Sequence, residues 1–374
     1  MSAFSVGTVS RGFMRILTFA AAWALIPMAL LTSLLLPFST WIRLALILLP
    51  VILFASWLIK LSVCGQLDRK TSPLPFWIAM AASILFLLSV AAFIRTGGLV
   101  SLDKTVRHVF QMKRSPAVGL MAEPGQRYRL FLNGIKLDIL SGFPDKGRAQ
   151  ILNYKVHGYM FSTIRFLFNE IFVDQHYFFV SDSPQPFVID CGSHIGMSIL
   201  YTKTLYPDAQ VIGFEPAPGT FKLLSENIRQ NGLRNVVLYN KAVGNTEGTM
   251  KFYGDDSLTA SLIESRNVGS VSEVDVVKLS RYIDRPVSFL KLDVEGAESL
   301  VLEDLNAASK LRMIKYMTIE YHHHIQKDAD NLSTFLKTLE DNNFGYQIET
   351  SPEPFSDRSY QDVMIYAYQK QALY

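Results

Sequence analysis

A turn that could bind a small ligand follows the apolar stretch at residues 187–191. Glycine permits a tight turn and lets a ligand approach the backbone without a side chain in the way. The acidic, polar and glycine residues of this turn are our first candidate ligand-binding residues: Asp190, Gly192, Ser193, His194 and Gly196. The same G-x-x-x-G spacing also occurs in strand-to-helix turns that only pack tightly, so the turn alone does not establish a binding site.

Glu215 is the second feature of interest, because it ends the next apolar stretch, residues 210–214. A carboxylate in that place can accept hydrogen bonds from the hydroxyl groups of a ribose. Dinucleotide sites use a similar acid, but their G-x-G-x-x-G pattern has a middle glycine that allows close approach of the pyrophosphate. That glycine is missing here, which favours a nucleoside without phosphates and predicts S-adenosylmethionine. A nicotinamide-dependent oxidoreductase is the alternative.

Acidic and histidine side chains further along the chain are candidates for the reaction itself. We expect Asp293, Glu295 and His322 to follow strands and therefore to lie at one edge of a sheet, where a base could take a proton from an acceptor. Asp293 could equally brace the turn. We expect Glu298 to satisfy free amide groups at the start of the next helix.

Three adjacent histidines, His322, His323 and His324, raise the question of a metal. Successive side chains of a strand point to opposite faces, so at most His322 and His324 could share one ion. This argues against a zinc hydrolase, because structural zinc takes four ligands. We assign no metal ligands, although a magnesium ion held by Asp293 and another acid is an alternative.

Stretches that suit strands alternate with stretches that suit helices from residue 187 onward. The expected strands are residues 187–191, 210–215, 236–240, 287–293 and 313–320, with two more near Tyr346 and Met364 and two in an insertion at 249–253 and 274–278. The expected helices are residues 197–205, 219–230 and 331–339, and one that begins at Ala297. This alternation predicts an α/β fold with a parallel sheet, helices on both faces and the ligand beyond the carboxyl ends of the strands.

The preceding region has its own pattern. Residues 128–139 alternate apolar and polar side chains around Asn133 and Gly134, which predicts a β-hairpin with a type I′ turn. A helix is expected at residues 162–172. We place both in a linker and lid region, residues 96–180, on the substrate side of the cofactor-binding domain at residues 181–374.

Several stretches of that domain are similar to the FkbM-type methyltransferases. They are residues 188–196, 213–221, 227–232, 242–244 with Gly248, and 290–298. The resemblance implies a seven-stranded, mostly parallel Rossmann-like sheet that binds S-adenosylmethionine, with Ala242 among the cofactor-binding residues. It also implies O-methylation of a hydroxyl group, often on a sugar or polyketide. The family usually has small residues and Asn where this chain has Cys191 to His194, so a contact from His194 to the methionine carboxylate stays open.

The first 95 residues are different in kind. Apolar runs at residues 16–36, 41–64 and 76–94 each approach the ~20 residues that a membrane-spanning helix needs. A cleaved signal peptide is the alternative for the first run, but the two further runs favour an anchor of three transmembrane helices. The numbers of basic residues expected on the two sides of the membrane are nearly equal, so they do not decide the orientation of the helices. Two membrane-spanning helices with one helix at the membrane surface are another possible arrangement. We place the catalytic domain in the cytosol, where the cofactor is kept.

The amino-acid composition argues against several other classes of protein. The 374 residues carry a net charge of +3, which is too small to suggest nucleic-acid binding. The two cysteines support neither a disulfide framework nor a thiolate metal site. We therefore expect a membrane-anchored O-methyltransferase with a sugar, glycan, lipid-linked or polyketide-like acceptor, and no preference for an oligomeric state. A non-catalytic membrane protein that retains a nucleoside pocket is the second alternative.

Overall fold

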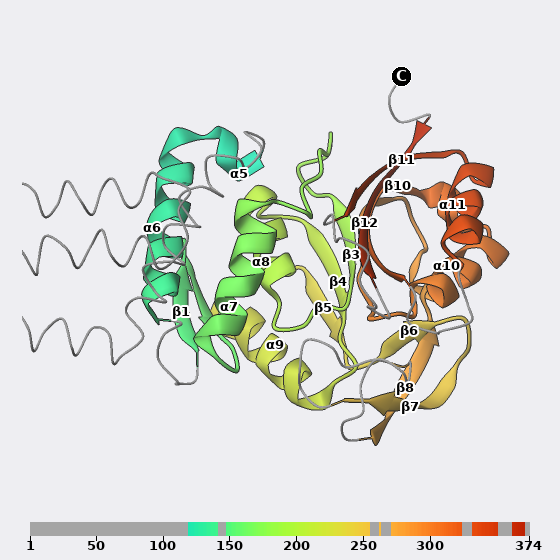
Figure 1. Ribbon diagram of the computed structural model, residues 1–374, viewed down its shortest axis with the longest axis horizontal. Helices are drawn as coiled ribbons and strands as arrows, with labels where there is room; N and C mark the ends of the chain where they lie inside the picture. Colours follow the sequence, from blue (N-terminus) through green and yellow to red (C-terminus); the bar gives the residue numbers. More distant parts are fainter. Residues whose placement is uncertain are drawn as a thin grey trace, which may run out of the picture. The chain divides into compact units, whose positions relative to one another are not determined.

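The computed structural model describes residues 119–140, 147–254, 262, 271–323, 331–350 and 361–370 (Figure 1). All of these belong to one unit, His108–Tyr374. The three apolar runs of the first 95 residues lie outside the described residues. Among the helices that are described, none is long and apolar enough to cross a membrane.

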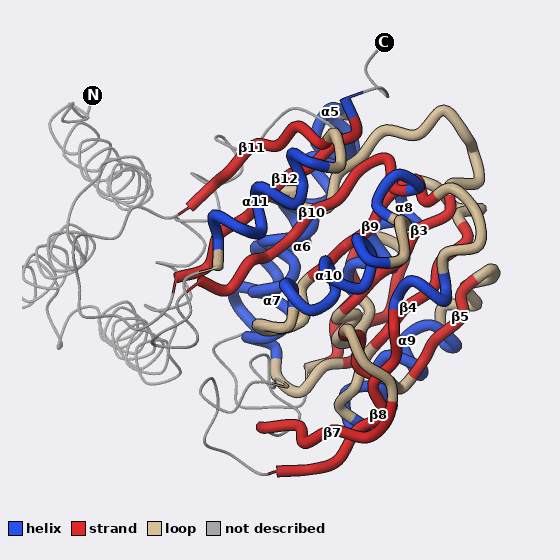
Figure 2. The backbone as a smooth tube through the Cα atoms, turned by 90° about the vertical axis from the view of Figure 1, so that its right-hand side faces the viewer, coloured by secondary structure: helices blue, strands red, loops and turns tan. Residues whose placement is uncertain are grey.

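The centre of the unit is a seven-stranded sheet with the order β11-β12-β10-β9-β3-β4-β5, whose strands lie side by side in Figure 2. Its strands are β3 (Phe187–Cys191), β4 (Gln210–Phe214), β5 (Val236–Tyr239), β9 (Val287–Leu292), β10 (Ile314–His323), β11 (Phe344–Thr350) and β12 (Gln361–Gln369). β12 runs antiparallel to both of its neighbours, and the other pairs are parallel. The prediction of a seven-stranded, mostly parallel sheet is confirmed.

Helices cover both faces of this sheet. They are α6 (Pro124–Leu140), α7 (Phe161–Phe168), α8 (Met197–Leu205), α9 (Pro218–Gln230), α10 (Glu298–Ala307) and α11 (Leu332–Asp341), with a short α5 (Gly119–Ala122). In Figure 1, α6, α7 and α8 lie to the left of the sheet and α10 and α11 to its right. Side chains alternate along β3: Val188 packs in the core with α8 and α9, whereas Ile189 packs with α10.

Two smaller sheets flank the main one. β6 (Ala242–Gly244), β7 (Gly248–Tyr253) and β8 (Val271–Lys278) form a three-stranded sheet, so the strands expected in the insertion are present. β1 (Arg148–Ile151) and β2 (Tyr154–His157) form an antiparallel hairpin. Its turn contains Leu152 with φ of 52°.

The hairpin predicted at residues 128–139 is wrong, because these residues form most of helix α6. Leu130 and Leu137 are buried on one face of α6, a helical spacing that outweighs the alternation of apolar and polar residues. The Asn-Gly pair does not form a turn. Asn133 instead accepts a hydrogen bond from the backbone N–H of Leu152 (2.9 Å) and donates to the carbonyl of Gln150 (3.1 Å), which ties α6 to the real hairpin.

The helix expected at residues 162–172 is confirmed, but its end is wound differently. α7 continues into a π-helical segment, η1 (Asn169–Val173). Such segments are rare and often occur at functional sites. Here η1 places Glu170 on the wall of the cavity described next.

Candidate functional site

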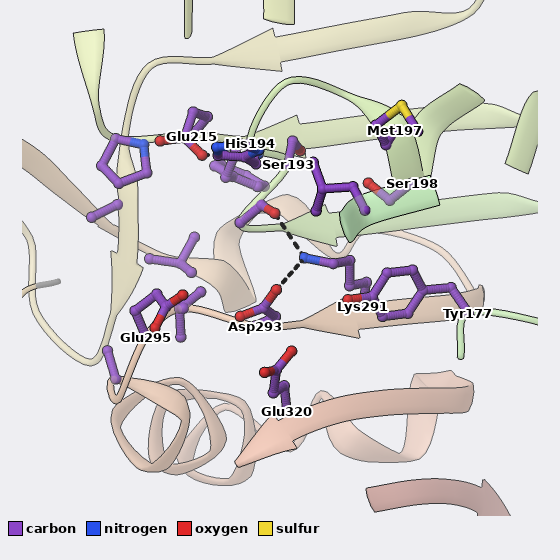
Figure 3. Close-up of a pocket in the computed structure, with 18 of the residues that line it drawn as sticks. Tyr177, Ser193, His194, Met197, Ser198, Glu215, Lys291, Asp293, Glu295 and Glu320 are labelled. Carbon is purple, nitrogen blue, oxygen red and sulfur yellow. Dashed lines mark hydrogen bonds and ion pairs between the residues drawn. The ribbon is translucent and has the colours of Figure 1, made fainter. Parts of the chain in front are cut away.

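A cavity of about 290 Å³ lies at the carboxyl ends of the central strands, where an open α/β sheet is expected to bind its ligand (Figure 3). One half is lined by residues that follow β3 and β4 and by the first residue of β6, among them His194, Glu215 and Ala242. The other half is lined by α7, η1, β10 and β12, including Glu170 and Glu320. We call these the nucleoside half and the acceptor half.

The turn after β3 requires its glycines. Gly192 has φ of 83°, and a Cβ there would overlap the carbonyl oxygen of Asp293, so the turn packs directly on the end of β9. Gly196 has φ of 89° and precedes α8, and a Cβ there would lie 2.8 Å from Cδ1 of Leu224. Gly192 and Ser193 line the cavity as predicted, whereas Gly196 shapes the turn without lining it.

Asp190, which the sequence predicts to bind the ligand, is not among the lining residues either. Its side chain is buried beneath the turn, where it accepts a hydrogen bond from the Ser198 hydroxyl (2.5 Å) and lies 3.8 Å from Nζ of Lys291. The Asp190 side chain is therefore directed toward Ser198 and Lys291 inside the protein. Its contacts hold the turn to α8 and β9.

Glu215 is buried at the end of β4 and faces the nucleoside half. One carboxylate oxygen accepts a hydrogen bond from the N–H of His194 (2.9 Å), and the other accepts one from the N–H of Ala217 (3.0 Å). Burial raises the pKa of Glu215 to about 7, against the opposing effect of these two bonds. Each oxygen keeps a second lone pair, so the carboxylate can still accept ribose hydroxyl groups.

His194 supplies an observation that fits a bound ligand. Its ring lines the cavity, and neither Nδ1 nor Nε2 has a hydrogen-bond partner among the described residues. Burial, together with the charge of Lys291, lowers the pKa of His194 to about 4, so the ring is neutral at pH 7. Buried polar atoms normally have partners, and a polar ligand would supply them here. The sequence left the contact of His194 open, and the geometry favours it.

Lys291 was not singled out from the sequence, although a lysine inside the buried strand β9 was an available signal. Its ammonium group is buried and donates to the carbonyl of Gly192 (2.7 Å) and to Asp293 (2.9 Å). Burial alone would lower the pKa of Lys291, but Asp293 and Asp190 outweigh it and raise the pKa. Lys291 therefore joins the glycine turn to the end of β9, and Figure 3 marks its bond to Asp293.

The three predicted catalytic residues lie near one another but in different positions. Asp293 and Glu295 line the cavity. His322 is not part of the lining: its ring is buried between Glu298, 2.9 Å from Nδ1, and Glu295, 3.3 Å from Nε2. The position at the end of β10 was predicted correctly, but the ring lies behind the acidic side chains. Direct contact of His322 with an acceptor is therefore not supported.

Glu298 has the bracing position that the sequence suggested. The same carboxylate oxygen that contacts His322 accepts hydrogen bonds from the N–H groups of Val294 (3.2 Å) and Gly296 (2.9 Å). Glu298 thus orders the turn between β9 and α10. This turn carries Glu295, whose φ is 57°.

Potential ligand atoms for a cation gather in the same place. They belong to the sets Asp293, Glu295, His322 and Glu320, His322, Asp362, and within each set they lie within 4.8 Å of one another. Ion pairs between an imidazole and carboxylates explain such a gathering equally well, so we still assign no metal ligands. His323 is buried in β10, and His324 lies outside the described residues.

Two relatives and a family model identify the chain. A model described as the methyltransferase FkbM domain matches residues 190–348. Methyltransferase 1 of Beauveria bassiana (strain ARSEF 2860) is 30% identical over 168 residues, with 38% of this chain and 68% of the relative covered. Methyltransferase sdnD of Sordaria araneosa is 30% identical over 179 residues, with 38% and 69% covered. The chain belongs to the FkbM methyltransferase family.

A solved structure is also similar to this FkbM methyltransferase. The crystal structure of methyltransferase FkbM from Methylobacillus flagellatus KT has a TM-score of 0.37 and 15% sequence identity, with 72% of this chain and 62% of that chain covered. This chain thus spans less than two thirds of that protein.

Membership of the FkbM family makes the chain an S-adenosylmethionine-dependent methyltransferase and disfavours the oxidoreductase alternative. The family match includes the glycine turn, Glu215 and β9 with the turn after it. It does not include α6, α7 or η1. The residues predicted to bind the cofactor therefore lie within the family match, whereas one wall of the acceptor half is built by residues outside it.

Proposed function

We propose that this methyltransferase transfers a methyl group to a hydroxyl oxygen of a sugar, glycan, lipid-linked or polyketide-like acceptor. The observation that carries the proposal is that one cavity is lined both by residues after β3 and β4 and by the carboxylates Glu170 and Glu320. S-adenosylmethionine, when bound, supplies an electrophilic methyl group. Carboxylates such as Glu170 and Glu320 are suited to accept hydrogen bonds from hydroxyl groups.

The residues present fit this cofactor. We propose that Glu215 accepts the ribose hydroxyl groups and that His194 with the backbone at Gly192 and Ser193 holds the methionine part. Ala242 and Phe252 contribute an apolar surface for the adenine ring of the cofactor. This assignment uses the ring nitrogens of His194 that have no partner among the described residues.

The acceptor half suits a ligand with both apolar and polar surface. Phe166 lies at its rim and is 56% exposed, and Leu167 and Ile171 continue the apolar wall. Tyr177 donates a hydrogen bond to Glu170 (3.2 Å) and so fixes the orientation of that carboxylate. Apolar walls with a few placed polar groups are typical of sites that bind small molecules.

A labelling experiment tests the proposed function. The purified full-length chain, incubated with methyl-labelled S-adenosylmethionine and extracts that contain lipid-linked glycans, should transfer label to one class of product. Mild hydrolysis and mass spectrometry should place the label on oxygen. Binding of S-adenosylmethionine without transfer to any fraction would instead support a non-catalytic protein that retains the pocket.

We also propose that residues 1–95 anchor the protein in the membrane with the catalytic domain in the cytosol. The support is the length of the three apolar runs. The full chain should stay with membranes after alkaline carbonate extraction, because spanning helices insert rather than adsorb. Removing residues 1–95 should release the rest. If the shortened chain still pellets with membranes, the anchor lies elsewhere.

A further inference from the structure

Carboxylates of the acceptor half and of the turn after β9 line the same cavity, and several of them already have a close partner. Asp293 accepts a hydrogen bond from the buried ammonium group of Lys291 (2.9 Å). Glu170 accepts one from the hydroxyl of Tyr177 (3.2 Å). Each of these two carboxylates therefore already accepts a hydrogen bond from a protein donor.

Glu295 and Asp362 are also poorly placed for this task. Glu295 lies 3.3 Å from Nε2 of His322, in a turn whose shape depends on Glu298. The side chain of Asp362 is 51% exposed, so water screens its charge. Glu295 thus already has a close ion-pair partner, and Asp362 is largely solvated.

Glu320 has neither a close ion-pair partner nor a largely exposed side chain, since 24% of the side chain is exposed. It lies near the carboxyl end of β10, lines the cavity, and in Figure 3 its carboxyl group points toward Asp293. Its one polar contact within the described part of the chain is the ion pair with Nε2 of His322, at 3.9 Å. The Glu320 carboxylate is therefore oriented toward the cavity without a close donor.

The surroundings of Glu320 favour a proton on it. Burial, together with the charges of Asp293 and Glu170, raises the pKa of Glu320 well above its usual range. Once ionised, a carboxylate with a raised pKa is a stronger base toward an acceptor hydroxyl group. The charged groups around it are Glu170 on η1, Lys291, Asp293 and Glu295 on and after β9, His322 on β10, and Asp362 on β12.

We propose that Glu320 is the general base of this methyltransferase, an inference that rests on the proposed function. The acceptor hydroxyl gives its proton to the Glu320 carboxylate, and the acceptor oxygen forms a bond to the methyl carbon. The methyl–sulfur bond breaks, and its electron pair stays on sulfur. The positive charge of the sulfonium and the negative charge of Glu320 disappear together, so charge is balanced.

His322 then has a positioning role. Its ring is fixed by Glu298 at Nδ1, and Nε2 faces both Glu295 and Glu320. The imidazole therefore lies behind these two carboxylates, 3.3 Å from Glu295 and 3.9 Å from Glu320, and does not line the cavity. It explains why a histidine at the end of β10 is buried rather than exposed to the acceptor.

The test compares Glu320→Gln with the wild-type full-length chain, using as acceptor the extract fraction that the wild type labels. Glu320→Gln should lower the single-turnover rate by about 10²- to 10⁴-fold. The dissociation constant for S-adenosylmethionine, measured by calorimetry, should change by less than about threefold, because Glu320 lies outside the nucleoside half. Glu320→Asp, which keeps a carboxylate, should recover part of the rate. Glu273→Gln, an exposed position on β8, should leave both quantities unchanged.

A spectroscopic measurement reports on Glu320 without turnover. The infrared band of a protonated carboxyl group should titrate above the usual range for glutamic acid in the wild type and lose one component in Glu320→Gln. A spectrum that is the same in both proteins contradicts the proposal.

The outcomes separate this inference from the proposed function. If the wild type labels no fraction of the extract, the proposed function fails and the base assignment fails with it. If the wild type transfers label and Glu320→Gln does so equally fast, only the base assignment fails. If Asp293→Asn abolishes transfer at unchanged cofactor affinity while Glu320→Gln does not, Asp293 is the base, as the sequence suggested.

Discussion

Glu215→Gln is expected to weaken the binding of S-adenosylmethionine about a hundredfold. The substitution keeps the shape of the side chain but removes a charged acceptor, and two hydrogen bonds to such an acceptor contribute roughly 3 kcal/mol or more. The amide group would also face the N–H groups of His194 and Ala217, which both donate to Glu215 in the wild type. Calorimetry on the full-length chain measures the change.

A matched control comes from α9. Glu226 is partly exposed and pairs with His157 outside the cavity, so Glu226→Gln should bind the cofactor as the wild type does. Equal affinities for Glu215→Gln and the wild type would remove Glu215 from the cofactor site.

The same residue predicts a pH dependence. Because the pKa of Glu215 is about 7 in the folded protein, its carboxylate becomes protonated as the pH falls below 7 and can no longer accept both ribose hydroxyl groups. Cofactor affinity should therefore fall by up to about tenfold per pH unit on the acidic side. In Glu215→Gln this dependence should disappear, and an unchanged pH profile in that variant would contradict the prediction.

The free energy of unfolding of the cofactor-free protein should change with pH in the opposite direction to the cofactor affinity. The folded pKa of Glu215 lies above its ordinary value of 4.5, so between these values the folded state binds more protons than the unfolded state. The cofactor-free protein should lose stability as the pH rises from about 4.5 to about 7. Thermal melts should thus show the largest stabilisation by the cofactor above pH 7, where the ionised Glu215 carboxylate accepts the ribose hydroxyl groups.

The parts of the fold that the sequence predicted best are those in which one pattern dominates. β3 and β4 are short apolar stretches that end in a polar residue at a turn, and α9 has apolar positions at helical spacing. α6 was missed because its residues satisfy two patterns at once. The Asn133-Gly134 pair fits a hairpin turn, but burial of Leu130 and Leu137 against the rest of the unit decides for a helix.

Site residues could be predicted from the sequence where the backbone conformation requires a particular residue type. They could not be predicted where the role of a side chain depends on the side chains packed around it. Gly192 is needed because of its positive φ, which a sequence pattern can indicate. The roles of His322 and Glu320 depend on which of two nearby side chains faces the cavity, and the end of a strand does not show that. Lys291 gains its role from strand β3, which is distant in the sequence.

Lys291→Met is expected to destabilise the unit by about 3–5 kcal/mol, because it removes the cation that faces Asp190 and Asp293 and leaves their charges uncompensated in a buried place. The carbonyl of Gly192 also loses a donor. Pulse proteolysis of the full-length chain in increasing urea, read from peptides of β3 and β9, measures the loss. Lys337→Met, at an exposed position of α11, should leave the midpoint unchanged.

A double-mutant cycle separates the ion pair from simple loss of packing. Asp293→Asn alone leaves the Lys291 ammonium with one close carboxylate fewer and should destabilise the protein. Combined with Lys291→Met, the same substitution removes an uncompensated charge, so the double variant should be more stable than the sum of the single effects implies by roughly 1–3 kcal/mol. Additive effects would mean that Lys291 and Asp293 do not depend on each other.

Coupling at this pair would have a consequence for the cofactor site. Lys291 contacts the carbonyl of Gly192 on the nucleoside side and Asp293 on the acceptor side, so a change at the end of β9 should also alter the glycine turn. Asp293→Asn should therefore weaken cofactor binding although Asp293 lies on the other side of Lys291 from Glu215. If calorimetry finds the affinity of Asp293→Asn unchanged while stability falls, the turn is held by Asp190 and Ser198 instead.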